Sequence, residues 1–222
     1  MDTLEAIRAR KSIRGYKLTP IPKETLKEII DIARHSPSAM NTQPWEITVI
    51  TGEVLDNIRQ GNVDMLISGA ISKPDFPVKA YQGKYRQRQV DLAIHIFGLL
   101  GIAREDKEMR AEWQQRGFRF FDAPAAIIMS VDRSVKGIFP FLDLGLIAQT
   151  ICLTALNFGL GTCIENQGIM FPEVIRKFTH LPESKRIVMS MAIGYPDWDD
   201  PANKVATKRE TVEDFVTWCG FD

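Results

Sequence analysis

Four cationic side chains and one hydroxyl group are crowded into a stretch of seven residues near the start of the chain, namely Arg8, Arg10, Lys11, Ser12 and Arg14. A dianionic phosphate is held best by fork-shaped guanidinium groups together with compact donors, and Arg10, Lys11 and Ser12 supply both kinds within one turn of chain. On composition alone, a solvated basic surface is the commoner interpretation of such a cluster. The sequence therefore offers a phosphate site here without requiring one.

A polar stretch follows at residues 36–45, Ser-Pro-Ser-Ala-Met-Asn-Thr-Gln-Pro-Trp, directly before an alternating strand pattern. Asn41 and Gln43 carry amides that donate and accept hydrogen bonds at once, which suits the edge of a heterocycle. Polar loop residues just before a strand are common in ligand sites. An ordinary helix-to-strand connection explains the same residues equally well.

Two further features lie late in the chain. Residues 159–166 read Gly-Leu-Gly-Thr-Cys-Ile-Glu-Asn, a glycine-flanked strand that ends in polar residues, although a plain turn and core strand have the same pattern. Lys208 and Arg209 follow Asn203 as a cationic pair, which carries little meaning by itself.

The elements that must position these residues follow from the spacing of apolar side chains. The patterns predict helices at residues 4–10, between Pro22 and Pro37, at 86–102 and at 142–158, the last apolar enough to be buried all round. They predict strands at residues 45–49, 125–131, 161–165 and 187–193, and a short helix or strand at 212–218. Residues 67–83 contain two prolines and little periodicity, and such long segments are often functional lids.

Composition excludes several classes of protein. The 222 residues carry 28 Lys and Arg against 28 Asp and Glu, and this zero net charge argues against a dedicated nucleic-acid binder. Three widely spaced cysteines without a C-x-x-C pair point to a reducing, cytoplasmic setting. The first residues lack the layout of a signal peptide, and polar residues interrupt the longest apolar stretch, so no membrane span is expected. Neither a metal pattern among the three histidines nor a dinucleotide, P-loop or G-x-S-x-G motif is present.

Taken in order, five of these pieces make the chain resemble the nitroreductase family of flavin mononucleotide (FMN) enzymes. They are R-x-R-K-S-x-R at 8–14, S-P-S-x-x-N-T-Q-P-W at 36–45, G-L-G-T-C-I-E at 159–165, I-G-Y-P at 193–196 and K-R at 208–209. Each motif is weak alone, but their order and spacing extend over essentially the whole chain. Residues 67–88, with P-x-x-x-Y and Y-R-x-R, are more similar to the branch that contains nitrobenzoate reductases.

The resemblance implies an α+β fold, a nitroreductase-like sandwich with a central, mainly antiparallel sheet flanked by helices, in an intertwined homodimer with FMN at the interface. It implies one FMN-binding domain over residues 1–222, with a lid or excursion at approximately 67–120. Phosphate and ribityl contacts are implied for Arg10, Lys11, Ser12 and Arg14, with Lys208 and Arg209 as a second cationic clamp. The loop that the partner subunit lays across the flavin is implied for Pro37, Ser38, Ala39, Asn41 and Gln43, and the strand facing the isoalloxazine for Cys163, Ile164, Glu165 and Asn166.

The implied activity is an NAD(P)H oxidoreductase with ping-pong kinetics that reduces nitroaromatic or quinone-like compounds. The flavin N5 performs the chemistry, so no side chain is expected to act as catalytic base and no metal is expected. Aromatic side chains are candidates to line the substrate pocket, although each is also typical of a core or interface; they are Phe76, Tyr81, Tyr85, Phe118 and Phe120. Two alternatives stay open: a reductase on the same scaffold with another task, such as dehalogenation, enoate reduction or flavin cleavage, and a non-catalytic flavin-binding protein.

Two residues of the implied flavin strand need separate expectations. An acidic group beside an electron-rich reduced flavin is unfavourable, so the side chain of Glu165 is expected to point elsewhere while its backbone faces the ring. Cys163 is expected to behave as a small buried hydrophobe instead of a redox thiol.

Overall fold

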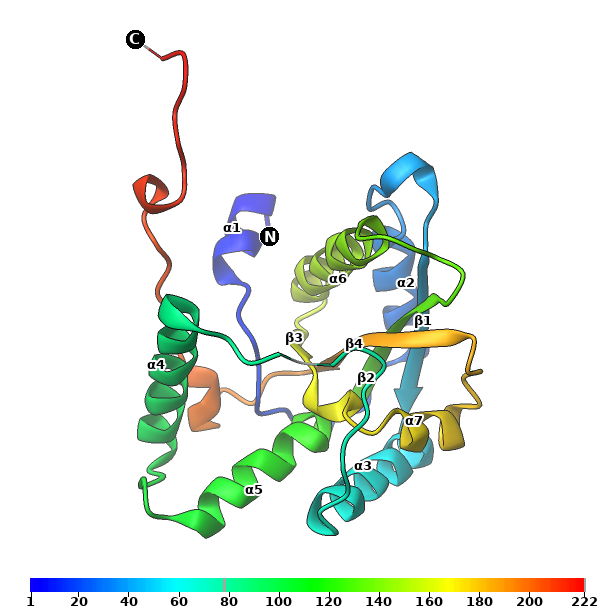
Figure 1. The fold of residues 1–222 in the computed structure, drawn as a ribbon, viewed down its shortest axis with the longest axis vertical. Coiled ribbons are helices and arrows are strands. Elements are labelled where there is room, and N and C mark those ends of the chain that lie inside the picture. The colour runs from blue at the N-terminus through cyan, green and yellow to red at the C-terminus, as the bar shows by residue number, and fades with distance from the viewer. Residues whose placement is uncertain (78, 222) are drawn as a thin grey trace.

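The computed structural model describes residues 1–77 and 79–221 and shows a four-stranded antiparallel sheet between two layers of helices (Figure 1). The strands are β1 (Trp45–Thr51), β2 (Ala125–Asp132), β3 (Gly161–Glu165) and β4 (Lys185–Gly194). The helices are α1 (Thr3–Ala9), α2 (Lys23–Ala33), α3 (Gly52–Ile67), α4 (Gly83–Leu100), α5 (Lys107–Phe118), α6 (Phe139–Asn157) and α7 (Pro172–Thr179). Short 3₁₀ turns lie at Ala39–Asn41, Phe120–Asp122, Gln167–Ile169, Pro201–Lys204 and Val212–Asp214.

The sheet has the order β1-β2-β4-β3, and every pairing between neighbouring strands is antiparallel. β2 lies in the interior of the sheet and is buried along nearly its whole length, which explains its continuous apolar run. Ile127 and Met129 point into the core formed with α2 and α6, while Ala126 and Ile128 point into the core with α3 and α7. The expected α+β sandwich is confirmed.

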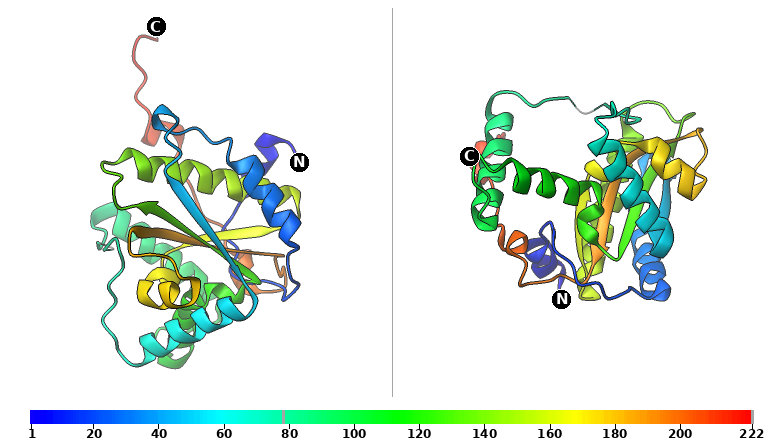
Figure 2. Two further views of the ribbon diagram at one scale, coloured as in Figure 1. Left: turned by 90° about the vertical axis from the view of Figure 1, so that its right-hand side faces the viewer. Right: turned by 90° about the horizontal axis from the view of Figure 1, so that it is seen from below.

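Figure 2 shows that α4 and α5 project from the sandwich, and that the C-terminal residues run away from its body. Residues 68–82, here called the connecting segment, link α3 to α4, and those of them that the structure describes (68–77 and 79–82) form no helix or strand. The absence of periodicity in the sequence correctly indicated this irregular stretch.

Three helices, α3, α5 and α7, were not predicted by the sequence patterns. In α3 a core position is occupied by Asn62, which is fully buried. Its side-chain amide donates to the carbonyl oxygens of Phe118 (3.1 Å) and Gly168 (2.9 Å), which lowers the cost of burying a polar group. This polar residue interrupts the apolar period that identifies a helix. α5 is polar on most of its surface, so it offers no apolar face to recognise.

The expectation that the helix at 142–158 is buried all round is wrong. α6 begins earlier, at Phe139, and presents an exposed apolar stripe of Phe139, Leu142 and Leu146, spaced three and four residues apart. Residues 212–218 form only one 3₁₀ turn, in place of the expected helix or strand.

Candidate functional site

The cationic stretch leaves α1 and runs beside the edge of the sheet. Arg10 ends α1, and the following residues are extended, with Ser12 bridged to Thr162 of β3 and the Ile13 amide donating to the Thr162 carbonyl at 3.0 Å. Gly161 makes this close approach possible, because a Cβ atom there would lie only 2.4 Å from the Ile13 side chain. Ile13 is buried, so the polar side chains on either side of it point away from the core.

These side chains line a cavity of about 240 Å³ between the N-terminal segment, α4 and the residues after the last strand. We call it the cationic cavity, and its lining residues are Arg10, Lys11, Ser12, Arg14, Leu92, Val205, Thr207 and Arg209. Four cations and two hydroxyl groups thus meet in a small space, and none of the described residues that line it carries a carboxylate. Such a donor set is suited to a phosphate group and to a polyhydroxylated chain.

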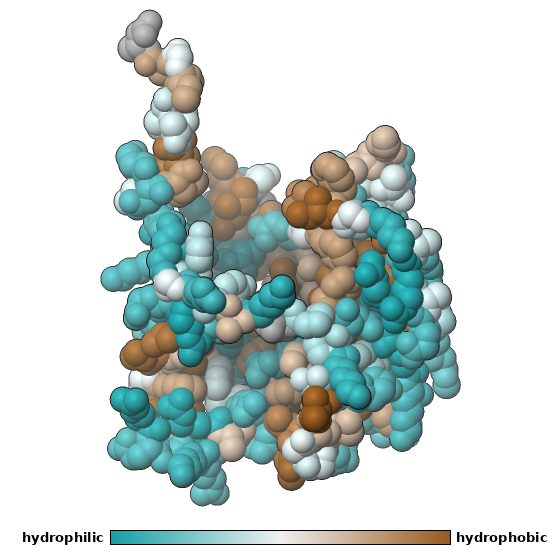
Figure 3. All heavy atoms as spheres, viewed as in Figure 1, coloured by the Kyte–Doolittle hydropathy of each residue, from teal (hydrophilic) through white to brown (hydrophobic). Residues whose placement is uncertain are grey.

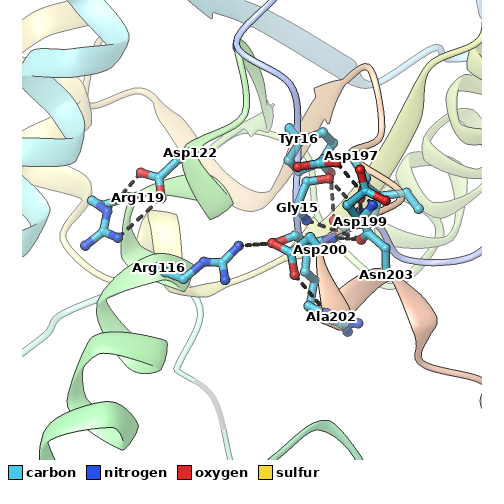
Figure 4. A network of polar contacts seen from close by, with 12 residues as sticks. Gly15, Tyr16, Arg116, Arg119, Asp122, Asp197, Asp199, Asp200, Ala202 and Asn203 are labelled. Carbon is cyan, nitrogen blue, oxygen red and sulfur yellow. Dashed lines mark hydrogen bonds and ion pairs between the residues drawn. The ribbon is translucent and has the colours of Figure 1, made fainter. Parts of the chain in front are cut away.

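One buried amide holds the N-terminal segment in place (Figure 4). The Oδ1 atom of Asn203 accepts from the amides of Arg14 (2.8 Å) and Gly15 (3.2 Å). Its Nδ2 atom donates to the carbonyl oxygens of Gly15 and Asp197, both at 2.7 Å. The side chain therefore uses its full hydrogen-bonding capacity to join residues nearly 190 positions apart.

Arg116 at the end of α5 strengthens the same junction (Figure 4). Its guanidinium donates to the Arg14 carbonyl oxygen (2.7 Å) and to the Asp200 carboxylate (2.8 Å). Asp200 in turn caps the 3₁₀ turn that carries Asn203. Neither Arg116 nor Asp200 belongs to a sequence motif, and their contact is formed only in the fold, so the sequence alone did not indicate them.

β3 ends beside this region, and its Glu165 side chain turns back into the protein, as expected. The carboxylate accepts from Ser190 Oγ at 2.5 Å and from the Gly168 amide at 2.9 Å. Burial is the main cause that raises the pKa of Glu165 to about 7, against the lowering effect of these hydrogen bonds. Burial likewise raises the pKa of the Cys163 thiol to about 11, which keeps it protonated and unreactive at neutral pH.

A second cavity of about 280 Å³ lies under the connecting segment, next to the residue that follows β3. We call it the aromatic cavity, and its lining residues are Pro74, Phe76, Pro77, Lys79, Tyr81, Asn166, Ile169, Met170 and Val188. It brings together two predicted substrate residues, Phe76 and Tyr81, with one predicted flavin residue, Asn166. The segment is anchored there by Asp75, which accepts from Arg176 and from the Ile187 amide, both at 2.7 Å.

The other predicted substrate residues are placed elsewhere. Phe118 and Phe120 are 6% and 0% exposed and pack in the core between the sheet and α3, so a small molecule does not reach them in this fold. The prediction that they line the pocket is therefore corrected in favour of the core interpretation. Tyr85 is exposed on α4, near the cationic groups of Lys84 and Arg88, and does not line the aromatic cavity.

The loop at residues 37–43 lies at the N-terminal end of α6, whereas β3 follows the C-terminal end of that helix (Figure 1). The loop therefore does not reach the cationic cavity of its own chain. Asp143 of α6 anchors it, accepting from the Ala39 amide at 3.2 Å. Met40, Asn41 and Gln43 all have positive φ angles (51°, 56° and 46°), a conformation that costs energy and concentrates at functional sites.

Lys208 and Arg209 differ in their surroundings. Arg209 lines the cationic cavity and donates to the Thr207 hydroxyl at 2.6 Å. Lys208 is exposed and does not line the cavity. Of the predicted clamp, the fold thus brings only Arg209 to the N-terminal cluster.

The chain is similar to known proteins over essentially its whole length. The model of the nitroreductase family matches residues 7–195. The chain is 36% identical to a 4-nitrobenzoate reductase from Pseudomonas putida, and the match covers 100% of this chain and 97% of that relative. It is 32% identical to a nitrobenzene nitroreductase from Ectopseudomonas oleovorans, and this match covers 96% of this chain and 95% of that relative. A crystal structure of an FMN- and NADPH-dependent nitroreductase from Sphingopyxis sp. strain HMH superposes with a TM-score of 0.95 at 26% identity, covering both chains fully.

Proposed function

The chain belongs to the nitroreductase family, and we propose that its cationic cavity binds the phosphate of the FMN with which it reduces nitroaromatic compounds. As a member of this family it is an NAD(P)H-dependent flavin oxidoreductase. Its similarity to the nitrobenzoate reductase branch, expected from residues 67–88, is confirmed by two 4-nitrobenzoate reductases at 36% and 28% identity.

The observation that carries the proposal is the composition of the cationic cavity. Its lining contains Arg10, Lys11, Arg14 and Arg209 and, in the part of the chain that the structure describes, no acidic residue, so an FMN phosphate would be bound by opposite charges from both ends of the chain. The hydroxyl groups of Ser12 and Thr207 suit the ribityl chain that follows the phosphate.

FMN supplies the redox chemistry when bound, accepting electrons from NAD(P)H and passing them to the nitro group. The protein supplies position and electrostatics. The strand end at Ile164, Glu165 and Asn166 offers its backbone to the flavin ring, while the Glu165 carboxylate is held back by Ser190 and Gly168. Phe76 and Tyr81 then form the wall against which an aromatic substrate stacks.

We further propose that the active enzyme is a homodimer, in which the partner's loop at residues 37–43 completes the flavin site. Figure 3 shows a hollow between the α4 side and the α6 side of the molecule, with apolar residues on its borders. The apolar stripe on α6 and the C-terminal residues Phe215, Trp218 and Phe221 are exposed in the single chain. Several large apolar side chains exposed along one helix and at the chain end are typical of an interface.

α6 is, within residues 1–77 and 79–221, the one helix long and apolar enough to cross a membrane, but half of it is buried inside the protein. It packs against α2 and the sheet, which makes it the core helix of the sandwich. We also propose a cytoplasmic location, which the three free cysteines Cys152, Cys163 and Cys219 support.

The test compares Arg10→Ala with Arg8→Ala, an equally drastic change on the exposed side of α1. Loss of one charged hydrogen bond should raise the Kd for FMN by roughly 10- to 150-fold in Arg10→Ala, corresponding to about 1.5–3 kcal/mol. Arg8→Ala should leave the Kd unchanged. Flavin content and Kd are measured by absorbance and by quenching of FMN fluorescence, and equal values for the two variants would refute the phosphate assignment.

The activity is tested on the purified holoenzyme without oxygen. Addition of NADPH should bleach the visible flavin spectrum, and 4-nitrobenzoate or nitrobenzene should restore it. A flavin that NADH and NADPH both fail to bleach would favour the non-catalytic flavin-binding alternative.

A further inference from the structure

The aromatic cavity combines an apolar wall with one ionised group. Pro74, Phe76 and Tyr81 from the connecting segment face Ile169, Met170 and Val188 from the body of the protein, as its lining shows. Its volume of about 280 Å³ lies just below the usual range for ligand pockets, which suits a ligand as small as a single aromatic ring.

Lys79 is the one charged side chain among the described residues that line this cavity. The acidic residue closest in sequence, Asp75, is 10% exposed and is already paired with Arg176 at 2.7 Å and with the Ile187 amide at 2.7 Å. The Lys79 charge is therefore not neutralised by that carboxylate. Lys79 is exposed at the border of the cavity, so its ammonium group is available to pair with an anionic ligand there, although solvent screens part of the attraction.

The wall beside Lys79 is held in a defined position. The Phe76 ring packs edge-on against Phe141, with ring centroids 4.9 Å apart, and the Arg186 guanidinium lies 4.8 Å from the centre of the same ring. These contacts, together with the Asp75–Arg176 ion pair, fasten the start of the connecting segment to the body. They also place a second positive charge near this wall.

We infer that the aromatic cavity selects aromatic substrates that carry a carboxylate, and that the Lys79 ammonium pairs with this group while Phe76 and Tyr81 contact the ring. The Asn166 amide provides a neutral hydrogen-bond donor for a second polar substituent, such as a nitro group. The inference rests on the proposed function, since it specifies which nitroaromatic compounds the enzyme prefers.

Ligand binding without turnover gives the direct test. The oxidised holoenzyme is titrated with benzoate and with benzamide, its uncharged analogue, and binding is followed by calorimetry. Lys79→Met keeps an apolar side chain of similar length and removes the charge, whereas Lys79→Arg keeps the charge. Lys73→Met is the matched control, because it removes an exposed charge on the same segment from a residue that does not line the cavity. We expect Lys79→Met to weaken benzoate binding about tenfold, the scale of a charge-assisted hydrogen bond, while benzamide binding is unchanged.

Lys79→Arg and Lys73→Met should both bind benzoate as the unsubstituted enzyme does. In turnover, Lys79→Met should lower kcat/KM for 4-nitrobenzoate about tenfold relative to nitrobenzene. An equal loss for benzoate and benzamide, or no benzoate binding to the unsubstituted enzyme, would overturn the inference. A raised KM for NADPH with unchanged benzoate binding would assign Lys79 to the nucleotide instead.

Failure of the proposed function has a different signature. If NADPH bleaches the flavin but no nitroaromatic compound restores it, nitroreduction is refuted. Lys79-dependent binding of benzoate in the same protein would still support the carboxylate site.

Discussion

Replacing Asn203 by alanine tests whether one buried amide maintains the geometry of the cationic cavity. The side chain is 2% exposed and makes four hydrogen bonds, two accepted from the amides of Arg14 and Gly15 and two donated to the carbonyls of Gly15 and Asp197. Alanine removes all four. The Gly15 carbonyl keeps one partner, because the Asp197 amide also donates to it at 3.0 Å.

The expected cost follows from these partners. A net loss of about 0.5–1.5 kcal/mol for each hydrogen bond, partly relieved at Gly15, predicts that Asn203→Ala lowers the free energy of unfolding by about 3 kcal/mol. The N-terminal segment loosens at Arg14, which lines the cavity, so FMN binding should weaken as well. Urea unfolding measures the first effect and an FMN fluorescence titration measures the second.

Asn57→Ala is the matched control, because Asn57 lies exposed on α3 and the same substitution there should change the free energy of unfolding by less than about 0.5 kcal/mol. Asn203→Asp sharpens the test. It keeps the acceptor oxygen but places a negative charge against two carbonyl oxygens, so this variant should regain stability as the pH falls and the carboxyl becomes protonated. An Asn203→Ala protein as stable as the control would refute the reasoning.

Three other substitutions test separate parts of the site. The pKa of Glu165, about 7, lies above the ordinary 4.5, so the folded state binds this proton more tightly than the unfolded state does. The free energy of unfolding should therefore decline by at most about 3 kcal/mol as the pH rises from 4.5 through 7. Urea unfolding between pH 5 and pH 8 measures this decline, and Glu165→Gln should make it smaller. Asp143→Ala leaves the Ala39 amide without its acceptor, and hydrogen exchange of the loop should accelerate about tenfold, whereas unchanged exchange would show that α6 does not anchor it. Asp75→Asn weakens the ion pair with Arg176, so trypsin should cut the connecting segment faster than in the unsubstituted protein, and an equal rate would contradict the anchoring role.

Several elements of the fold could be predicted from local patterns. The Asp2–Glu5 capping box marks the start of α1, and both of its hydrogen bonds are present. The continuous apolar run of β2 likewise indicates burial on both faces of the strand, and the period of α2 indicates burial on one face of the helix. α3 escaped detection because its core-facing Asn62 donates to carbonyl groups from distant parts of the chain, which no local pattern reveals.

The exposed stripe on α6 is a case in which the local pattern predicted more burial than the structure shows. Its apolar composition predicts burial all round, but Leu142 and Leu146 are exposed in the single chain. The apolar composition of a helix indicates that its faces are to be buried, but it does not indicate whether the same chain or another protein chain buries them. For that reason the sequence pattern alone does not distinguish a core contact from an interface.

By itself, the sequence determined which chemical groups are present and the order in which they occur: a cluster of cations at residues 8–14, an amide-bearing loop, a strand that ends in polar residues and a late Lys-Arg pair. Only the tertiary structure decided which of them meet. Arg209, but not Lys208, reaches the cluster, and Phe76 and Tyr81 meet Asn166 while Phe118 and Phe120 are enclosed in the core. Local propensity depends on a few neighbouring residues, whereas a cavity depends on contacts such as that between Asn203 and Gly15, which form only when distant segments pack together.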